Sequence, residues 1–319
     1  MNRLLLILLM NLICPLALAS GEAPTSVPFI DDLGRQVTIP NHPQRIVSVY
    51  DIDITIPLIE LGVMPVGSHG RLSKKGTPYI RSSALLTGVD FDNSQITFIG
   101  ATNVDLETIV KLKPDLIITA NSRPTPVGLL AKIAPTISLD SALGAPHIYQ
   151  QLAKVTHTEQ KLAILERRYQ EQINSLKAAV ETKNITVSVM QPLRGKISVY
   201  HSYRSLGRVL RDAGFKFPPI INQIPAGERV DFSAERLPEL DADIIFDPYF
   251  SNNKPQLEIA KMNAILPGFC QFLSACKKGN YVLVSRDAAI SNSYAGLEAM
   301  TMTVQAHLTP KPYYPQTDK

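Results

Sequence analysis

A short pattern of residues occurs twice in this chain, and it constrains the possible fold more than any other feature. Residues 105–118 (DLETIVKLKPDLII) match residues 233–246 (SAERLPELDADIIF) without a gap, each residue of the second copy lying 128 positions after its counterpart. In each copy a helix-capping residue precedes a short helical segment, a tight turn and an apolar strand. The repeat therefore predicts two similar lobes that contain the same helix–turn–strand unit.

A long helix is predicted between the two copies, over residues 156–182. Its apolar side chains recur at spacings of three and four residues and so share one helical face; they are Leu162, Leu165, Tyr169, Ile173, Leu176 and Val180. Thr156 and Glu159 form a T-x-x-E capping box at its start, and neither proline nor glycine interrupts it before Asn184. Such length in mid-chain favours a rigid connection between lobes over an ordinary surface helix.

Predicted strands and helices alternate on both sides of this helix. Buried strands are expected at 45–50, 116–119, 133–139, 185–190, 196–201, 243–246 and 281–285, with helices at 53–62, 206–213 and 294–307. This alternation is typical of parallel sheets. We predict an α/β fold in which two parallel-sheet α/β lobes are joined by one long interlobe helix, with a ligand cleft between the lobes. The expected divisions are 1–19 signal peptide, 20–150 N-terminal lobe, 151–183 linking helix and 184–319 C-terminal lobe.

The first residues have the composition of a secretory signal peptide. Arg3 supplies the positive charge, residues 4–13 form a short apolar segment, and Ala17-Leu18-Ala19 is a small-x-small cleavage site. The apolar segment is too short to span a bilayer and is followed by Pro15. We expect cleavage after Ala19 and a periplasmic mature protein.

Charge and cysteine content argue against a nucleic-acid-binding protein and against a zinc-binding protein. A formal net charge of +4 without a Lys/Arg run gives no support for nucleic-acid binding. Cys270 and Cys276 are the two cysteines outside the signal peptide, and in an oxidising compartment a disulfide between them is favoured over free thiols. A zinc site would need further ligands nearby, and the sequence offers none.

Glu107 and Glu235 occupy the same position in the two copies of the repeat, two residues after the predicted caps Asp105 and Ser233. A carboxylate in the first turn of a helix interacts favourably with the helix dipole, and this explains either residue alone. Two of them at equivalent positions, one in each lobe, also suit a partner that carries two basic pockets. Such peripheral charges determine the orientation and the association rate of a protein complex more than its affinity.

Several segments together resemble a known family: 43–47 (PQRIV), 61–67 (LGVMPVG), 105–117, 230–235 (VDFSAE) and 296–298 (GLE). The family is the class III, or helical-backbone, periplasmic binding proteins, which are the iron–siderophore and cobalamin receptors of ABC importers. The resemblance extends from about residue 28 to 308. It implies two α/β lobes on one long helix, a ligand cleft that closes little, and contacts of Glu107 and Glu235 with arginines of two permease subunits in the inner membrane.

Residues at the carboxyl ends of the predicted strands should line the cleft. Arginine is frequent there and suits an anionic ferric catecholate, because its fork donates hydrogen bonds and its plane stacks on rings. Aromatic side chains could supply further walls. The expected ligand contacts are Tyr50, His69, Arg71, Arg123, Arg194, Tyr203, Arg204, Arg229, Tyr249 and Arg286. The resemblance singles out Arg71 and Arg123, which fall where siderophore-binding relatives carry basic contacts.

Direct binding of iron by protein side chains is not expected. Some members of the family ligate iron with a histidine before the V-x-F segment and a tyrosine before G-L-E, and Ala226 and Ser291 stand at these places here. The six histidines are scattered without a metal-binding spacing. We therefore expect a ligand whose iron is already fully chelated, and no cofactor.

The resulting hypothesis is a monomeric receptor that captures a ferric siderophore, of the catecholate type, and delivers it to an ABC permease. Ferric citrate, haem and cobalamin are alternative ligands, although the absence of tryptophan does not favour the last two. A secreted hydrolase is a further alternative, but the chain has no G-x-S-x-G motif, and we expect no enzymatic activity. An adhesive surface protein would have a cleft that binds nothing.

Overall fold

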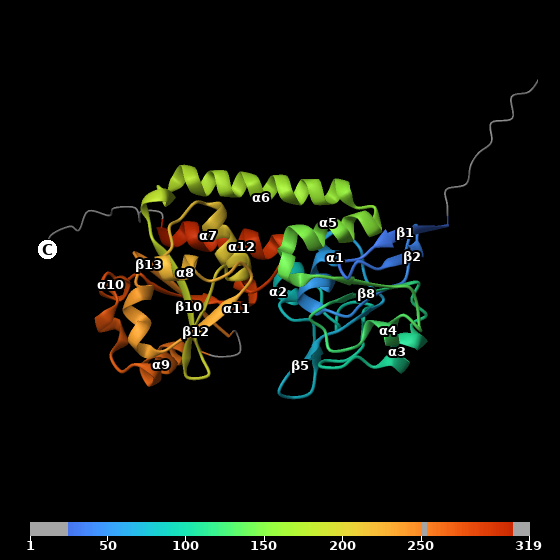
Figure 1. The fold of residues 1–319 in the computed structure, drawn as a ribbon, viewed down its shortest axis with the longest axis horizontal. Helices are drawn as coiled ribbons and strands as arrows, with labels where there is room; N and C mark the ends of the chain where they lie inside the picture. The colour runs from blue at the N-terminus through green and yellow to red at the C-terminus, as the bar shows by residue number, and fades with distance from the viewer. Residues whose placement is uncertain (1–24, 251–253, 309–319) are drawn as a thin grey trace, which may run out of the picture.

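The computed structural model describes residues 25–250 and 254–308. The predicted signal peptide, residues 1–19, lies outside the described residues. The chain forms two lobes, and α6 (Glu159–Ala179) runs along one side of both (Figure 1). None of the helices in the described residues combines the length and apolar character that a membrane span requires.

The sheet of the N-terminal lobe is parallel throughout, as predicted. Its strand order is β7-β4-β3-β8-β9, and every neighbouring pair is parallel. The strands are β3 (Ile46–Ser48), β4 (Gly67–Ser68), β7 (Thr97–Phe98), β8 (Leu116–Ala120) and β9 (Thr136–Leu139). The order reverses at β3, so that the carboxyl ends of β3, β4 and β8 meet at one edge, which is where α/β sheets bind ligands.

Two antiparallel hairpins and several short helices complete this lobe. The hairpins are β1 (Ser26–Ile30) with β2 (Gln36–Pro40), and β5 (Arg71–Leu72) with β6 (Pro78–Tyr79). The helical segments are η1 (Asp51–Thr55), α1 (Ile56–Glu60), α2 (Ser83–Thr87), α3 (Leu106–Lys111), α4 (Val127–Leu130), η2 (Ser141–Leu143) and α5 (Gly144–Thr156). Of these, η1 is a π-helical turn directly after β3.

The sheet of the C-terminal lobe is mixed, so the expectation of a parallel sheet holds there only in part. In the order β12-β11-β10-β13-β14, β10, β13 and β14 are parallel, whereas β11 and β12 are antiparallel additions. Arg194 and Gly195 link β10 to β11 and both have positive φ, 53° and 71°. Such a two-residue turn joins only antiparallel strands. The strands are β10 (Val187–Leu193), β11 (Lys196–Tyr200), β12 (Arg229–Phe232), β13 (Ile244–Tyr249) and β14 (Tyr281–Ser285).

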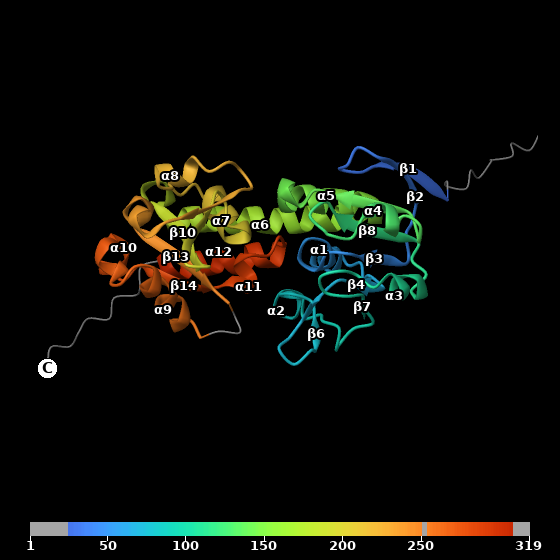
Figure 2. The same ribbon diagram turned by 60° about the horizontal axis from the view of Figure 1, so that its bottom comes forward.

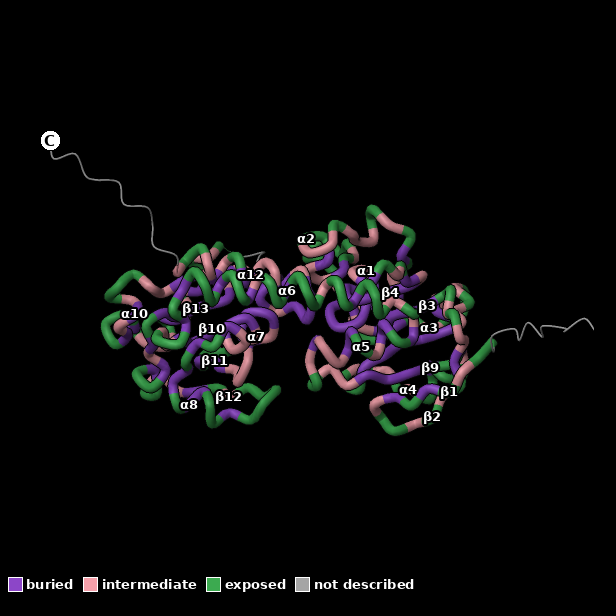
Figure 3. Tube along the Cα trace, turned by 90° about the horizontal axis from the view of Figure 1, so that it is seen from above, coloured by how far each residue is buried: buried purple, intermediate pink, exposed green. Residues whose placement is uncertain are grey.

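Helices surround this second sheet. They are η3 (Thr182–Asn184), α7 (Arg204–Asp212), α8 (Pro219–Asn222), η4 (Ala234–Leu240), α9 (Gln256–Ile265), η5 (Phe269–Phe272), α10 (Ser274–Lys277), α11 (Arg286–Ala289) and α12 (Tyr294–Leu308). The inner strands of both sheets are buried, whereas the edge strand β12 is largely exposed and α6 has one exposed face (Figure 3). A disulfide joins Cys270 in η5 to Cys276 in α10.

The repeated unit is present in both lobes, with one difference between the copies. In the first copy α3 leads into β8, and Oδ1 of Asp105 accepts hydrogen bonds from the backbone N–H groups of Glu107 and Thr108. In the second copy η4 leads into β13 but is a 3-10 helix, and Ser233 makes no capping hydrogen bond. Pro238 lies inside η4 and cannot donate a backbone hydrogen bond, which disfavours an α-helix there.

The interlobe helix begins later than predicted, and the prediction of a capping box at Thr156 and Glu159 is wrong. Thr156 is the last residue of α5, and its hydroxyl donates to the carbonyl of Leu152 at 2.7 Å. His157 follows in a left-handed conformation (φ 54°) and separates α5 from α6. Residues 151–156, assigned to the linking helix from the sequence, therefore belong to α5. The predicted apolar face is present, since Leu162, Tyr169, Ile173 and Leu176 are all buried.

The two lobes contact each other along their inner sides. In Figure 2, α2 of the N-terminal lobe faces α11 and α12 of the C-terminal lobe, and the three helices are in contact. The carboxylate of Glu60 in α1 accepts hydrogen bonds of 3.0 Å from the backbone N–H groups of Tyr294 and Ala295 at the start of α12. Tyr149 in α5 also donates to Glu60, and its ring packs against that of Tyr294.

Candidate ligand-binding cleft

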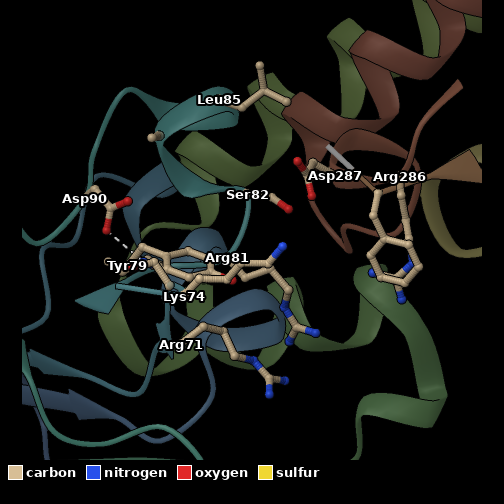
Figure 4. Close-up of a pocket in the computed structure, with 13 residues that line it drawn as sticks. Arg71, Lys74, Tyr79, Arg81, Ser82, Leu85, Asp90, Arg286 and Asp287 are labelled. Atoms are coloured by element: carbon tan, nitrogen blue, oxygen red, sulfur yellow. Dashed lines mark hydrogen bonds between the residues drawn. The ribbon is translucent and has the colours of Figure 1, made fainter. Parts of the chain in front are cut away.

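A pocket of about 680 Å³ lies where the two lobes meet (Figure 4). Its N-terminal wall comes from residues 71–90, that is, from the β5–β6 hairpin, α2 and the loop after it. Phe250, Arg286 and Asp287 form the opposite wall from the C-terminal lobe. The pocket thus lies near the carboxyl ends of β4, β13 and β14, in agreement with the expected interlobe cleft.

Basic side chains outnumber acidic ones around this pocket. The cations are Arg71, Lys74, Arg81 and Arg286, and the acids are Asp90 and Asp287. In Figure 4 Arg71, Lys74 and Arg81 extend side by side from the N-terminal wall, and Arg286 lies across the pocket from them. The carboxylate of Asp90 accepts hydrogen bonds from the backbone N–H groups of Ile80 and Phe91, at 2.7 and 2.8 Å, and so serves the local turn. The pocket therefore favours an anionic occupant.

Asp51 holds the arginines of the N-terminal wall. It begins η1 and is completely buried. Its Oδ1 accepts a hydrogen bond of 3.0 Å from Nη2 of Arg81, and its Oδ2 lies 3.9 Å from Nε of Arg71. Burial alone would raise the pKa of Asp51, but the adjacent His69 ring and the charges of Arg81 and Arg71 outweigh it and keep that pKa below its usual value.

Arg204 connects the lobes, whereas the sequence predicted a ligand contact. Its Nη1 donates to Oδ1 of Asp53 at 2.7 Å. Asp53 is completely buried, and burial raises its pKa although the charge of Arg204 opposes the shift. The pKa of Arg204 is raised, because the proximity of Asp53 outweighs the effect of burial. Arg204 thus donates to a buried carboxylate of the opposite lobe.

Aromatic rings and cations are paired in both lobes, and one of these pairs, Arg286 with Phe250, lines the pocket. The guanidinium carbon of Arg286 lies 4.6 Å from the ring centroid of Phe250, and Nζ of Lys261 lies 5.5 Å from the same centroid. In the N-terminal lobe the guanidinium carbon of Arg123 lies 5.0 Å from the centroid of the Tyr50 ring. A cation–π contact of this kind restricts the position of the guanidinium, and in the pocket wall it does so for Arg286.

Several predicted contacts lie away from the pocket. Tyr203 is buried in the C-terminal lobe, where its hydroxyl donates to Oε1 of Gln191 at 3.3 Å, so it forms no cleft wall. His69 is completely buried behind the wall, and its Nε2 contacts the carbonyl of Ala101. Arg123 donates to the carbonyl of Thr102 at 3.2 Å.

The remaining predicted contacts belong to the C-terminal lobe. Arg229 lies on β12 and pairs with Asp231, the Nε–Oδ1 distance being 3.2 Å. Arg194 is exposed in the turn between β10 and β11. Tyr249 ends β13, and it is the next residue, Phe250, that lines the pocket. Of the ten predicted ligand contacts, Arg71 and Arg286 line it.

Lys74, Tyr79 and Arg81 line the pocket but were not among the predicted contacts. All three come from one short segment that also contains Arg71, and Ser73 shapes its turn by accepting hydrogen bonds from the backbone N–H groups of Lys75 and Thr77. The sequence feature that could have identified these residues is the local density of basic residues beside glycine and proline. This hairpin was not among the predicted strands. The prediction from the carboxyl ends of strands therefore included only its first residue, Arg71.

No group of three or more His, Cys, Asp or Glu side chains within residues 25–250 and 254–308 is arranged to hold a metal ion. At one of the two positions where iron-ligating relatives carry a ligand, Ser291 is buried and its hydroxyl donates to the carbonyl of Ala288 at 3.0 Å.

Comparison with known proteins decides the family. The family model described as "Periplasmic binding protein" matches residues 77–247, which is more than half of the chain. The chain belongs to the periplasmic binding protein family. It is 30% identical over 224 residues to the iron(3+)-hydroxamate-binding protein FhuD of Bacillus subtilis (strain 168); the match covers 66% of this chain but only 65% of that protein.

Solved structures share the fold of this family member. The structure of Staphylococcus aureus SirA complexed with staphyloferrin B superposes with a TM-score of 0.70 at 22% identity, covering 88% of this chain and 97% of that one. A FhuD fold-family component of a Fep/Fec-like ferrichrome ABC transporter from Bacillus subtilis gives 0.71 at 22% identity, covering 88% and 99%. At this identity the likeness shows the fold, and it confirms the expected two-lobed α/β class.

The two glutamates of the repeat are exposed, one in each lobe. Glu107 lies in the first turn of α3 and Glu235 in the first turn of η4. The pKa of Glu235 is lowered, chiefly by a hydrogen bond from the Ser233 side chain, so this group remains charged under physiological conditions. Both carboxylates are therefore accessible to a partner protein.

Proposed function

We propose that this protein is exported to the periplasm, captures a ferric siderophore in the interlobe pocket and delivers it to an ABC permease of the inner membrane. The ligand is an anionic complex of the catecholate type, and its iron is fully chelated before it reaches the protein. The protein acts as a monomer, performs no catalytic step and uses no cofactor. The observation that carries the proposal is the cationic pocket between the lobes, lined by Arg71, Lys74, Arg81 and Arg286.

The chemistry of this pocket supports an anionic, partly aromatic ligand. Guanidinium groups donate paired hydrogen bonds to oxygens and also stack on flat rings. Phe250 and Tyr79 supply apolar faces beside these cations. The named relatives bind or transport different siderophores: FhuD of Bacillus subtilis is a hydroxamate-binding protein, and SirA was solved with staphyloferrin B. The charge of the pocket favours the anionic class over a neutral hydroxamate complex.

We infer delivery to a permease from the matched glutamates. Glu107 and Glu235 are exposed at equivalent positions of a duplicated element, one per lobe. Two such carboxylates suit a membrane partner with two basic pockets, and they act mainly on orientation and association rate. Membership of the periplasmic binding protein family agrees with this role.

The experiment that tests the proposed function is the visible absorption spectrum of the protein recovered from iron-starved cells of its source. The expected result is a ligand-to-metal charge-transfer band of a ferric catecholate, together with the mass of an intact complex in native mass spectrometry. Protein recovered with a haem or corrinoid spectrum, or with ferric citrate or a ferric hydroxamate, would contradict the catecholate assignment. Protein that carries no iron complex and binds none when mixed with each of these would contradict the function itself.

A further inference from the structure

Beside α3, which carries Glu107, lies an apolar groove that no contact within the described residues fills. It has a volume of about 460 Å³ and lies between α3 and α4. Its walls are the side chains of Leu106, Val110, Leu129 and Ile133. Val110 is 54% exposed and Leu129 is 41% exposed, so both of these large apolar side chains are accessible to a partner along the groove.

Charged side chains surround this groove. Glu107, Lys111 and Lys132 line its rim, and Lys113 is exposed just after α3. Within residues 25–250 and 254–308, none of the three lysines forms a salt bridge with an acidic side chain. An apolar centre with a polar rim is the usual composition of a protein interface. The groove is therefore continuous with the surface on which we place the docking residue Glu107.

The second copy of the repeat has different surroundings. Lys111 and Lys113 correspond to Glu239 and Asp241, and Val110 corresponds to Pro238. The hollow beside η4 has a similar volume, about 440 Å³, but its lining includes the charged groups of Arg211, Lys216, Glu239 and Asp241.

The acidic groups near η4 also have partners within the lobe. Both carboxylate oxygens of Glu239 accept hydrogen bonds of 2.8 Å from Arg236. The carboxylate of Asp241 accepts hydrogen bonds from the backbone N–H of Ser274 at 2.9 Å. Glu239 and Asp241 in the lining of this hollow are thus paired, and Glu235 does not line it, whereas Glu107 lines the apolar groove of the first copy. The two glutamates are equivalent in position, but their neighbourhoods differ in both polarity and charge.

From this difference we infer, on the basis of the proposed function, that the groove between α3 and α4 receives an apolar side chain of one permease subunit, next to the basic side chain that meets Glu107. Acidic groups of the same subunit face Lys111 and Lys132. The permease surface that meets Glu235 has no such apolar side chain. The two halves of the permease therefore differ where they contact this protein, and docking occurs in one orientation.

Single substitutions in the groove test this inference. Leu129→Asp and Val110→Asp each place a charge in the groove, and both side chains are exposed, so the fold should tolerate them. Leu257→Asp is the matched control, since Leu257 is an exposed leucine (43%) in α9 of the other lobe. Each purified protein, loaded with a ferric catecholate, is titrated onto the source organism's importer in lipid nanodiscs. Thermal unfolding and affinity for the ferric complex are measured in parallel.

We expect both groove variants to bind the importer at least about tenfold more weakly than the wild type, which is the loss typical of a central interface residue. Their affinity for the ferric complex and their unfolding temperature should be unchanged, and Leu257→Asp should behave as wild type throughout. Importer binding that survives both groove substitutions, or that Leu257→Asp weakens equally, would overturn the inference. Wild-type protein that does not bind the importer at all would instead overturn the proposed function, a result visible before any variant is compared.

Photo-crosslinking tests the orientation. With p-benzoylphenylalanine at position 129, crosslinks should map to one permease subunit, or to one half of a fused permease. With the same group at position 236, beside Glu235, they should map to the other. Equal crosslinking of both halves from position 129 would overturn the single orientation.

Discussion

The carboxylate of Asp53, in the π-helical turn of the N-terminal lobe, accepts a hydrogen bond of 2.7 Å from Nη1 of Arg204, the first residue of α7 in the C-terminal lobe. Asp53 is completely buried, and the Arg204 side chain is 30% exposed. Asp53 lies two residues after Asp51, which holds the arginines of the pocket wall. The relative position of the two lobes and the arrangement of the ligand site thus depend on the same turn.

Replacing Arg204 by alanine should therefore destabilise the protein. The substitution leaves the Asp53 carboxylate buried without its partner, which costs about 3 kcal/mol when one member of a buried ion pair is removed. Urea unfolding followed by circular dichroism measures the change. Arg208→Ala on the same helix is the control, because Arg208 and Asp212 are both more than one third exposed and their pair is worth at most about 0.5 kcal/mol. Equal losses in the two variants would contradict a special role for the interlobe pair.

The cationic wall should account for much of the ligand affinity. Arg71→Ala and Arg81→Ala each remove a charged donor from the pocket, and each should weaken binding of a ferric catecholate by about 1–3 kcal/mol. Isothermal titration calorimetry gives the dissociation constants. Arg194→Ala provides the comparison, because Arg194 is an exposed arginine at the turn between β10 and β11 and does not line the pocket. If Arg194→Ala weakened binding as much as the pocket variants, the ligand would occupy another part of the cleft.

Asp247 should make the stability of the C-terminal lobe depend on pH. Burial, with the nearby charge of Glu258, raises the pKa of Asp247 to about 7, although a hydrogen bond from Tyr281 opposes the shift. Because the pKa of Asp247 is higher in the folded than in the unfolded protein, the neutral carboxyl stabilises the fold. This contribution to the free energy of unfolding is complete below the unfolded-state pKa of about 4 and is lost as the pH rises through 7.

Asp247→Asn keeps the side chain neutral at every pH. The variant should gain stability relative to wild type as the pH rises from 4 to 8, by up to about 4 kcal/mol. Thermal and urea unfolding at several pH values measure the difference between the two proteins, so that the other carboxylates cancel. A constant difference across this range would show that Asp247 is already ionised at low pH in the folded protein.

Removing both docking glutamates should separate ligand capture from delivery. The double variant Glu107→Ala/Glu235→Ala should bind the ferric siderophore as wild type does, because neither residue lines the pocket. Uptake of iron-55 siderophore by cells that carry only this variant should fall at least about tenfold, the loss expected when two interfacial charges are removed. Glu159→Ala is the control, an exposed glutamate in the first turn of α6. Normal uptake by the double variant would refute docking through these residues.

The sequence was sufficient for the architecture because its signals are periodic or repeated. The duplicated segment predicted the helix–strand unit in both lobes, and the apolar spacing predicted the buried face of α6. The capping box failed because Thr156 can serve either as a helix start or as a helix end, and His157 adopts the left-handed conformation that ends α5. The strand β11 was predicted, but its antiparallel direction was not, because a strand's direction depends on the turn at Arg194 and Gly195, whose positive φ angles are not visible in the apolar pattern.

The ligand site was predictable only in part, because strand ends give position along the chain and not side-chain direction. Arg71 and Arg286 follow strand ends and point into the pocket. Arg204 also follows a strand closely, but its partner Asp53 is distant in sequence, and only the fold brings the two together. Tyr203 could not be distinguished from a cleft residue, since its burial against Gln191 depends on how α7 packs on the sheet.

The central claim is that the interlobe pocket binds an anionic ferric complex, and fluorescence titration of the purified protein tests it most directly. The chain contains 11 tyrosines and no tryptophan, so its protein fluorescence comes from tyrosine, and one of these tyrosines, Tyr79, lines the pocket. A ferric tris-catecholate should quench this emission with a dissociation constant below about 1 µM, at least about 100-fold tighter than a neutral ferric hydroxamate. Tighter binding of the neutral hydroxamate, or binding of neither complex, would contradict the claim.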